Sequence, residues 1–180
     1  MNYLVIILIT VFMLFYIQCY YKIPKDFSLI QTTLSDFTPD IFLEKQPIYL
    51  FDQIVNPADL LSTLFKYQYW YHILSLSKNN FVKQNLSKWV IIYNDGYSDT
   101  TVSIMHPEES KHRTFLPSRF IKKNYILCKN TTVTNSCVEI LLKPKKNVFI
   151  PMNWIYKTNA DNLLEIHLHD PITCISSFII

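Results

Sequence analysis

The sequence predicts a mainly β domain, an antiparallel sandwich or barrel with one or two helices near its start, preceded by an apolar N-terminal helix. Short runs of alternating or β-branched apolar residues recur from residue 88 to the end, with no helical segment between them. The clearest helical periodicity within the domain lies at residues 56–77. Because 49% of the residues are hydrophobic, the chain can build a core and is not expected to be disordered.

The N-terminal segment has the features of an uncleaved membrane anchor. Residues 1–21 carry no charged side chain, and residues 3–21 as a helix would span about 28 Å, close to the ~30 Å of bilayer hydrocarbon. Tyr16, Tyr20 and Tyr21 gather at its far end, as in an interfacial aromatic belt. A signal peptide is the alternative, but the segment lacks a basic start and a small-residue cleavage site.

The lysines that follow the anchor predict its orientation in the membrane. Lys22 and Lys25 lie just after it, so the positive-inside tendency predicts a single-pass membrane protein with its domain on the cytoplasmic face. The triplets at Asn85 and Asn130 are glycosylation sequons and leave a lumenal glycoprotein as an alternative. We therefore expect an anchor at 1–21, a stalk at 22–44 and the β domain at 45–180.

The β domain is expected to open with a buried strand and one long helix. Pro47 begins an apolar strand at 46–54, where its missing N–H does least harm. Asn56 can cap the helix predicted at 56–77, and Pro57 suits its first position. A further short helix is expected at 26–34. The predicted strands that follow are residues 88–94, 100–107, 119–129, 136–144, 147–151, 163–170 and 173–180.

Two cysteines flank a polar segment that looks like a hairpin connection. Cys128 and Cys137 enclose residues 129–136, so the two thiols could face each other across neighbouring strands. We expect them to be reduced and half-buried in a cytoplasmic domain.

Several function classes are disfavoured by composition. Gly96 is the only glycine, which argues against phosphate cradles that need several glycines. The lysines are scattered rather than gathered on a basic stripe, so no nucleic-acid partner is expected. No nucleophile–His–acid arrangement stands out along the chain.

A metal site is the most specific functional hypothesis that the sequence offers. His106 and Glu108 have the His-x-acid spacing of two ligands in a facial triad, and His167 or His169 could supply the third. We expect instead that His106 and Glu108 lie in a solvated loop, because Pro107 interrupts the strand that would present them. We likewise expect Glu165, His167 and His169, which alternate along one strand, to form a solvent-facing row. The prediction is therefore no metal, with iron and 2-oxoglutarate as the alternative cofactors.

Two proline-marked segments resemble the cupin-like, Jumonji-related (JmjC-like) domain family. Pro47 matches the proline of the family's early strand, and Phe149, Ile150, Pro151 and Trp154 match its late Ile-Pro-x-x-Trp-x-His motif. The resemblance covers roughly residues 45–175 and implies a double-stranded β-helix. The family's iron-binding histidine falls at Tyr156, and the Gly-Asp before the motif is Lys146-Asn147.

These departures imply a cupin-type shell without its metal. We expect Pro151 to end a strand, Trp154 to be buried at the barrel mouth against the helix holding Trp70 or the strand holding Trp89, and Tyr156 to occupy a former ligand position. Degenerate domains of this kind occur in large DNA viruses. The expected role is thus a non-catalytic structural or interaction protein, with the lipid bilayer and a protein such as a capsid or membrane protein as partners, in a virion's internal membrane. The alternative is an Fe(II)/2-oxoglutarate-dependent oxygenase.

Overall fold

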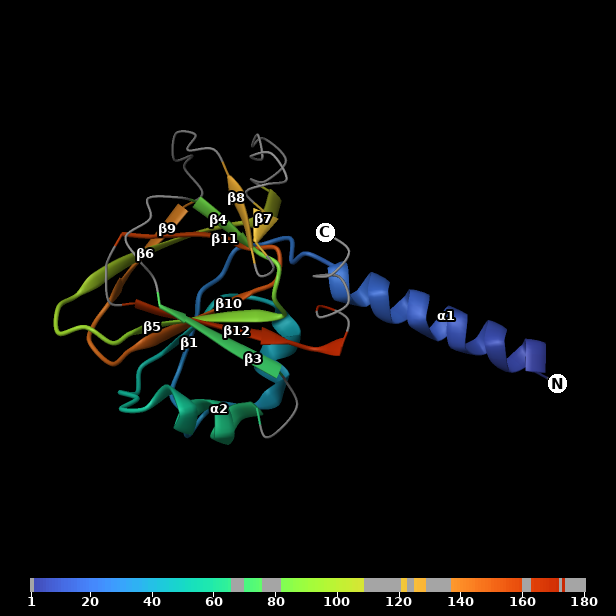
Figure 1. The fold of residues 1–180 in the computed structure, drawn as a ribbon, viewed down its shortest axis with the longest axis horizontal. Helices are drawn as coiled ribbons and strands as arrows, with labels where there is room; N and C mark the ends of the chain where they lie inside the picture. Colours follow the sequence, from blue (N-terminus) through green and yellow to red (C-terminus); the bar gives the residue numbers. More distant parts are fainter. Residues whose placement is uncertain are drawn as a thin grey trace.

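Two packed sheets and a flanking helix make up the domain in the computed structural model (Figure 1). The structure describes residues 2–65, 70–75, 82–108, 121–122, 125–128, 137–159, 163–171 and 173. Sheet A has the order β1-β2-β10-β5-β12-β3, and sheet B the order β7-β8-β4-β11-β6-β9. Every pairing is antiparallel except that of β1 with β2. The mainly β prediction is therefore confirmed.

The elements follow one another with few helices. The helices are α1 (Asn2–Tyr21), the short 3-10 helix η1 (Pro39–Glu44) and α2 (Pro57–Phe65). The strands of sheet A are β1 (Ile30–Thr32), β2 (Ile48–Leu50), β3 (Trp70–Ser75), β5 (Trp89–Asn94), β10 (Asn147–Pro151) and β12 (Leu163–His169). Those of sheet B are β4 (Val82–Asn85), β6 (Thr100–Met105), β7 (Ile121–Lys122), β8 (Tyr125–Cys128), β9 (Cys137–Leu142) and β11 (Ile155–Thr158).

Eight of the strands pair in a nested pattern. Strand β3 pairs with β12, β4 with β11, β5 with β10 and β6 with β9, so the first of the eight meets the last and the pairing proceeds inward. The remaining strands β1 and β2 extend sheet A beside β10, and β7 and β8 extend sheet B beside β4. The chain therefore folds as one long antiparallel ribbon that wraps into two facing sheets.

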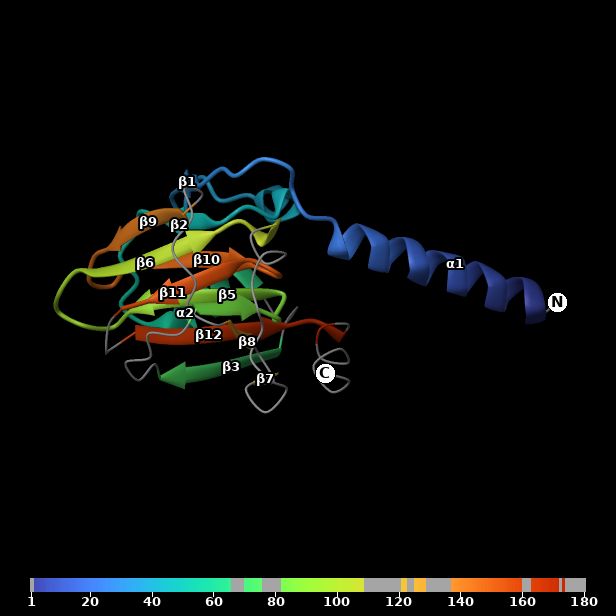
Figure 2. The ribbon, with the colours of Figure 1, turned by 90° about the horizontal axis from the view of Figure 1, so that it is seen from above.

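The central strands of sheet A, β10, β5 and β12, are buried on both faces because they lie between two cores. In β5, Val90 and Ile92 belong to the inner core between the sheets, whereas Trp89, Ile91 and Tyr93 belong to the outer core against α2 and η1. This alternation follows from the period of two along a strand. It explains why β5 is apolar at five of its six positions and buried along its whole length. Figure 2 shows β10, β5 and β12 of sheet A together with β11 and β6 of sheet B.

The predicted helix at 56–77 is correct only in its first half. Asn56 Oδ1 accepts a hydrogen bond from the Ala58 N–H at 3.0 Å, and α2 then ends at Phe65. Residues 70–75 form β3, which pairs with β12 along six positions. The segment is rich in aromatic and β-branched residues, so pairing with β12 overrides its helical spacing. The expected helix at 26–34 is also wrong, because β1 occupies residues 30–32.

The hairpin expected between Cys128 and Cys137 is likewise wrong. Strand β8 pairs with β4, and β9 pairs with β6 on the other side of β11. Three strands therefore separate the backbones of the two cysteines, and they cannot face each other as predicted. The Cys137 side chain is half-buried.

Helix α1 projects from the sandwich, with its N-terminus at the far end (Figures 1 and 2). Its described apolar side chains are exposed, among them Leu4, Leu8, Phe12 and Phe15. Within the described part of the chain, which leaves out the side chains of residues 2, 16 and 19–21, no helix is long and apolar enough to span a membrane.

Trp154 is fully buried, as predicted, and lies in the inner core with Val90 of β5. Its ring meets Phe27 edge-on at a centroid distance of 5.0 Å and His106 at 5.2 Å, and its Nε1–H donates to the Lys45 carbonyl at 3.1 Å. The expected helical partner at Trp70 is wrong, since residue 70 begins β3. Trp154 thus connects the turn after β10 to Phe27 and Lys45, which lie between α1 and β2.

Replacing Trp154 by alanine should lower the free energy of unfolding by about 3 to 5 kcal/mol, because a buried indole and its cavity are lost. Urea unfolding followed by circular dichroism measures this change. Tyr97→Ala is the matched control, since Tyr97 is 100% exposed and should change stability by about 0.5 kcal/mol or less. Equal effects of the two changes would contradict the assignment of Trp154 to the core.

Candidate functional site

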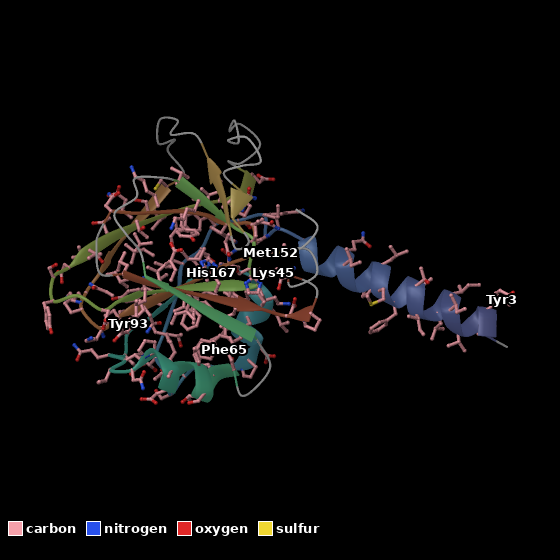
Figure 3. All side chains as sticks on the ribbon, viewed as in Figure 1. Tyr3, Lys45, Phe65, Tyr93, Met152 and His167 are labelled. Carbon is pink, nitrogen blue, oxygen red and sulfur yellow. The ribbon has the colours of Figure 1, made fainter. Side chains whose placement is uncertain are left out.

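A cluster of polar side chains lies in the inner core between the sheets. Lys83 on β4 is 2% exposed, and Glu165 and His167 on β12 are fully buried. The Lys83 ammonium Nζ lies 2.8 Å from Glu165 Oε1. His167 Nε2 lies 3.2 Å from Glu165 Oε2, and His167 Nδ1 lies 2.7 Å from the hydroxyl of Ser87. Figure 3 shows His167 at the centre of the sandwich.

Strand alternation brings these groups together. On β12, Leu163 belongs to the inner core and Ile166 and Leu168 to the outer core. Glu165 and His167 share the parity of Leu163, so they point toward sheet B. Lys83 stands opposite Tyr156 in the β4–β11 register, with its Nζ 5.8 Å from the centroid of the Tyr156 ring. The ion pair therefore crosses from one sheet to the other.

A turn held by Asn85 positions Ser87. The Asn85 side-chain oxygen accepts the Ser87 N–H at 2.9 Å, and its amide donates to the Ile150 carbonyl at 3.1 Å. This is the short-range bond that an asparagine side chain makes two residues onward in a turn. Since Asn85 is fully buried, the folded domain cannot carry a glycan there. Asn130 lies outside the described residues.

The electrostatics of the cluster favour the charged carboxylate. Burial alone raises the pKa of Glu165, but the hydrogen bond from His167 and the charge of Lys83 outweigh it, so its pKa lies below the ordinary value. When Nε2 carries the ring proton, His167 donates from Nε2 to Glu165 and accepts the Ser87 hydroxyl at Nδ1. Every polar atom in this chain of contacts has a partner.

Ser87, His167 and Glu165 have the order of a nucleophile, a base and an orienting acid. Sequence reasoning missed this set, because its members lie on β12 and in the turn after β4, 80 residues apart. All three side chains are fully buried, so the Ser87 hydroxyl is shielded from solvent in this structure. Lys83 also shares the carboxylate that would orient the base. What the arrangement does is neutralise the charge of Lys83 inside the sandwich.

The candidate ligands His106 and Glu108 lie elsewhere and in a different setting from that predicted. His106 is buried at the end of β6, so the solvated loop is wrong for this residue, although Glu108 is exposed. His106 Nδ1 accepts the Glu108 N–H at 3.2 Å, and Nε2 therefore carries the proton that it donates to the Pro24 carbonyl at 2.9 Å. These contacts tie the end of β6 to the segment after α1.

The solvent-facing row predicted on β12 is also wrong. Glu165 and His167 are fully buried and His169 is 2% exposed, because sheet B covers the face on which they were placed. Glu165 and His167 come together, but His106 contacts Pro24 and Trp154 in another part of the molecule. Among the described residues, no group of three or more His, Cys, Asp or Glu side chains could hold a metal ion.

The signature positions of the resemblance are buried. Pro47 immediately precedes β2, and Ile150 lies on β10 in the inner core. Pro151 ends β10, as predicted, and Trp154 follows in the turn. Tyr156 on β11 is fully buried in the inner core and faces Lys83 in the register. Lys83 was the residue that sequence reasoning overlooked, since nothing in the polar segment 82–85 signals a buried ion pair.

A second candidate site is a cavity of about 160 Å³ near the end of α1, where β5 begins and β10 ends. Its lining combines aromatic and aliphatic side chains with three lysines. Figure 3 labels two of the lining residues, Lys45 and Met152, on the side of the sandwich nearest α1.

No protein-family model matches the chain. No curated protein matches it either.

Removing one member of the ion pair should be costly, and removing both charges should not. Lys83→Met leaves the Glu165 carboxylate without its cation and should lower the free energy of unfolding by about 3 to 5 kcal/mol. The double change Lys83→Met/Glu165→Gln keeps an acceptor for His167 and should recover most of that loss. Urea unfolding measures both variants. A double variant as unstable as the single one would contradict the pairing.

The ion pair should also make the stability of the domain sensitive to acid. The pKa of Glu165 is lowered on folding, so its contribution to stability is present above its ordinary pKa of 4.5 and is lost as pH falls through the folded value. Stability measured against pH should therefore fall below about pH 4.5 more steeply in the wild type than in Lys83→Met/Glu165→Gln. Burial raises the pKa of Asp170, but its contacts with Thr173 and Lys88 outweigh this effect, so its pKa is also lowered. Asp170 is present in both proteins and therefore contributes equally to the two stability curves. Parallel curves would contradict the assignment.

Proposed function

We propose that the chain is a membrane-attached, non-catalytic cupin-like protein with a structural or interaction role. The observation that carries this proposal is the Lys83 ammonium in the inner core. It sits 2.8 Å from Glu165 and next to Tyr156, the position at which the resemblance implies an iron-binding histidine. A fixed cation thus occupies the neighbourhood in which an active relative would hold its metal.

The nested pairing of eight strands supports the cupin-like double-stranded β-helix. Jelly rolls and cupins are double-sheet structures of eight strands, and here β3, β4, β5 and β6 pair with β12, β11, β10 and β9 in that order. The additional strands lie at the ends of the two sheets. Tyr156 lies on β11, between β4 and β6, and is fully buried in the inner core.

Charge supports the absence of catalysis. A unit positive charge and a divalent cation 4 Å apart repel each other by about 8 kcal/mol at an effective dielectric constant of 20. Lys83 and His167 already use both oxygens of the Glu165 carboxylate. A metal at this place would have to displace Lys83 and leave its ammonium buried without a partner.

Helix α1 supports attachment to a lipid bilayer. It has no charged residue along its 20 positions, and its described apolar side chains are exposed on every side. A helix that is apolar all round needs a buried or a lipid environment. With Lys22 immediately after it, the β domain would remain on the cytoplasmic face. By analogy with the degenerate cupin domains of large DNA viruses, the proposed setting is a virion's internal membrane, with a capsid or membrane protein as partner.

Restoring the family's histidine should not restore iron chemistry. Tyr156→His adds one imidazole to a place where Lys83 still holds the carboxylate, so the full-length variant should bind no stoichiometric Fe(II) by calorimetry. It should also show no 2-oxoglutarate decarboxylation above the level of the wild type. His106→Ala is the control for the alternative oxygenase site. Iron-dependent turnover in the wild type that His106→Ala or His167→Ala removes would overturn the non-catalytic proposal.

A further inference from the structure

The cavity at the end of α1 has the shape and lining of a small amphiphile site. Its volume is about 160 Å³, similar to the ~150 Å³ of an apolar cavity that accommodates benzene. The rings of Phe42 and Trp89 pack together in its wall with centroids 5.0 Å apart. Trp154 contributes a further aromatic surface, so the interior suits apolar atoms.

The charged residues of the lining all have one sign. Lys22, Lys45 and Lys88 line the cavity, and none of its described lining residues is acidic. Lys45 Nζ donates to the Lys22 carbonyl at 3.2 Å, which draws two of the lysines together. Lys88 is paired with Asp170 at 3.0 Å, and Lys22 and Lys45 add two further positive charges to the wall of the cavity. This combination suits an anion that carries an apolar part.

The position of the cavity fixes its relation to the membrane. Lys22, Ile23 and Pro24 follow α1 directly and belong to the lining. If α1 lies in the bilayer, these residues stand at the level of the lipid head groups. The cytoplasmic leaflet, which the topology proposed above assigns to this side, is the one that carries anionic lipids.

We propose that this cavity binds the head-group region of an anionic phospholipid from the leaflet that α1 enters. Lys22 and Lys45 contact the phosphate, while the aromatic walls cover the glycerol and the first acyl carbons. The inference rests on the proposed membrane attachment. It assigns to the turn after β10, with Met152 and Asn153 in the lining, a role in orienting the domain on the membrane.

Quenching of tryptophan fluorescence tests the site, because Trp89 and Trp154 line it. The full-length chain is reconstituted in phosphatidylcholine vesicles, and part of the lipid is replaced by phosphatidylglycerol brominated near the acyl carbonyls. Brominated phosphatidylglycerol should quench more strongly than the same amount of brominated phosphatidylcholine. Lys22→Gln/Lys45→Gln should weaken the apparent affinity for phosphatidylglycerol about 30-fold, at the usual contribution of each surface lysine to anionic-lipid binding.

Two exposed leucines provide a test variant and its control, and neither substitution disturbs the core. Leu43 lines the cavity and is 76% exposed, whereas Leu141 on β9 is 56% exposed and is not part of the lining. Leu43→Glu should abolish the preference for phosphatidylglycerol, and Leu141→Glu should leave it unchanged. Equal quenching by the two lipids, or no effect of Leu43→Glu, would overturn the site. So would displacement of the lipid by glycerol 3-phosphate at equal concentration, since the ligand would then be a soluble phosphate.

A flotation experiment distinguishes failure of the membrane attachment from failure of the lipid site. A full-length chain that does not float with pure phosphatidylcholine vesicles would overturn both proposals. A chain that floats with them, yet shows no lipid preference, would overturn the lipid site alone.

Discussion

Burying the charge of Lys83 is the constraint on which the interior of this protein depends. An ammonium removed from water needs a carboxylate at contact distance, and that carboxylate needs its second oxygen satisfied. Glu165 meets the first need at 2.8 Å, and His167 meets the second. Because Lys83 belongs to sheet B and Glu165 to sheet A, the pair sets how the two sheets face each other. Val90, Ile92, Ile104 and Trp154 then fill the remaining inner core.

The interior and the cavity are joined through one asparagine. Asn85 lies two residues from Lys83 on β4, and its side chain holds both Ser87 and the Ile150 carbonyl. Its backbone N–H donates to the Trp154 carbonyl at 2.9 Å, and the Trp154 indole donates to Lys45. The same turn therefore supports the ion pair on one side and the lysine-lined cavity on the other.

Sequence reasoning succeeded where one local rule decided the outcome. Strand β5 and the end of β10 at Pro151 follow from alternation and from the missing N–H of proline, and the burial of Trp154 follows from its position after that strand. It failed where a distant partner decided. Residues 70–75 have helical spacing yet pair with β12, and Glu165 and His167 look like a solvated row until sheet B covers them. Lys83 has no local mark of burial, since its partner lies 82 residues away.

Crystals of the full-length protein grown with Mn²⁺ would show whether the inner core holds an ion pair or a metal, because Mn²⁺ stands in for ferrous iron and scatters anomalously. We expect no anomalous peak between β4 and β12, with continuous density joining the Lys83 ammonium to the Glu165 carboxylate. An anomalous peak bonded to Glu165 and His167, with the Lys83 side chain turned away, would contradict it. The inner core would then be a metal site, and the ion pair would be the state it adopts when no metal is bound.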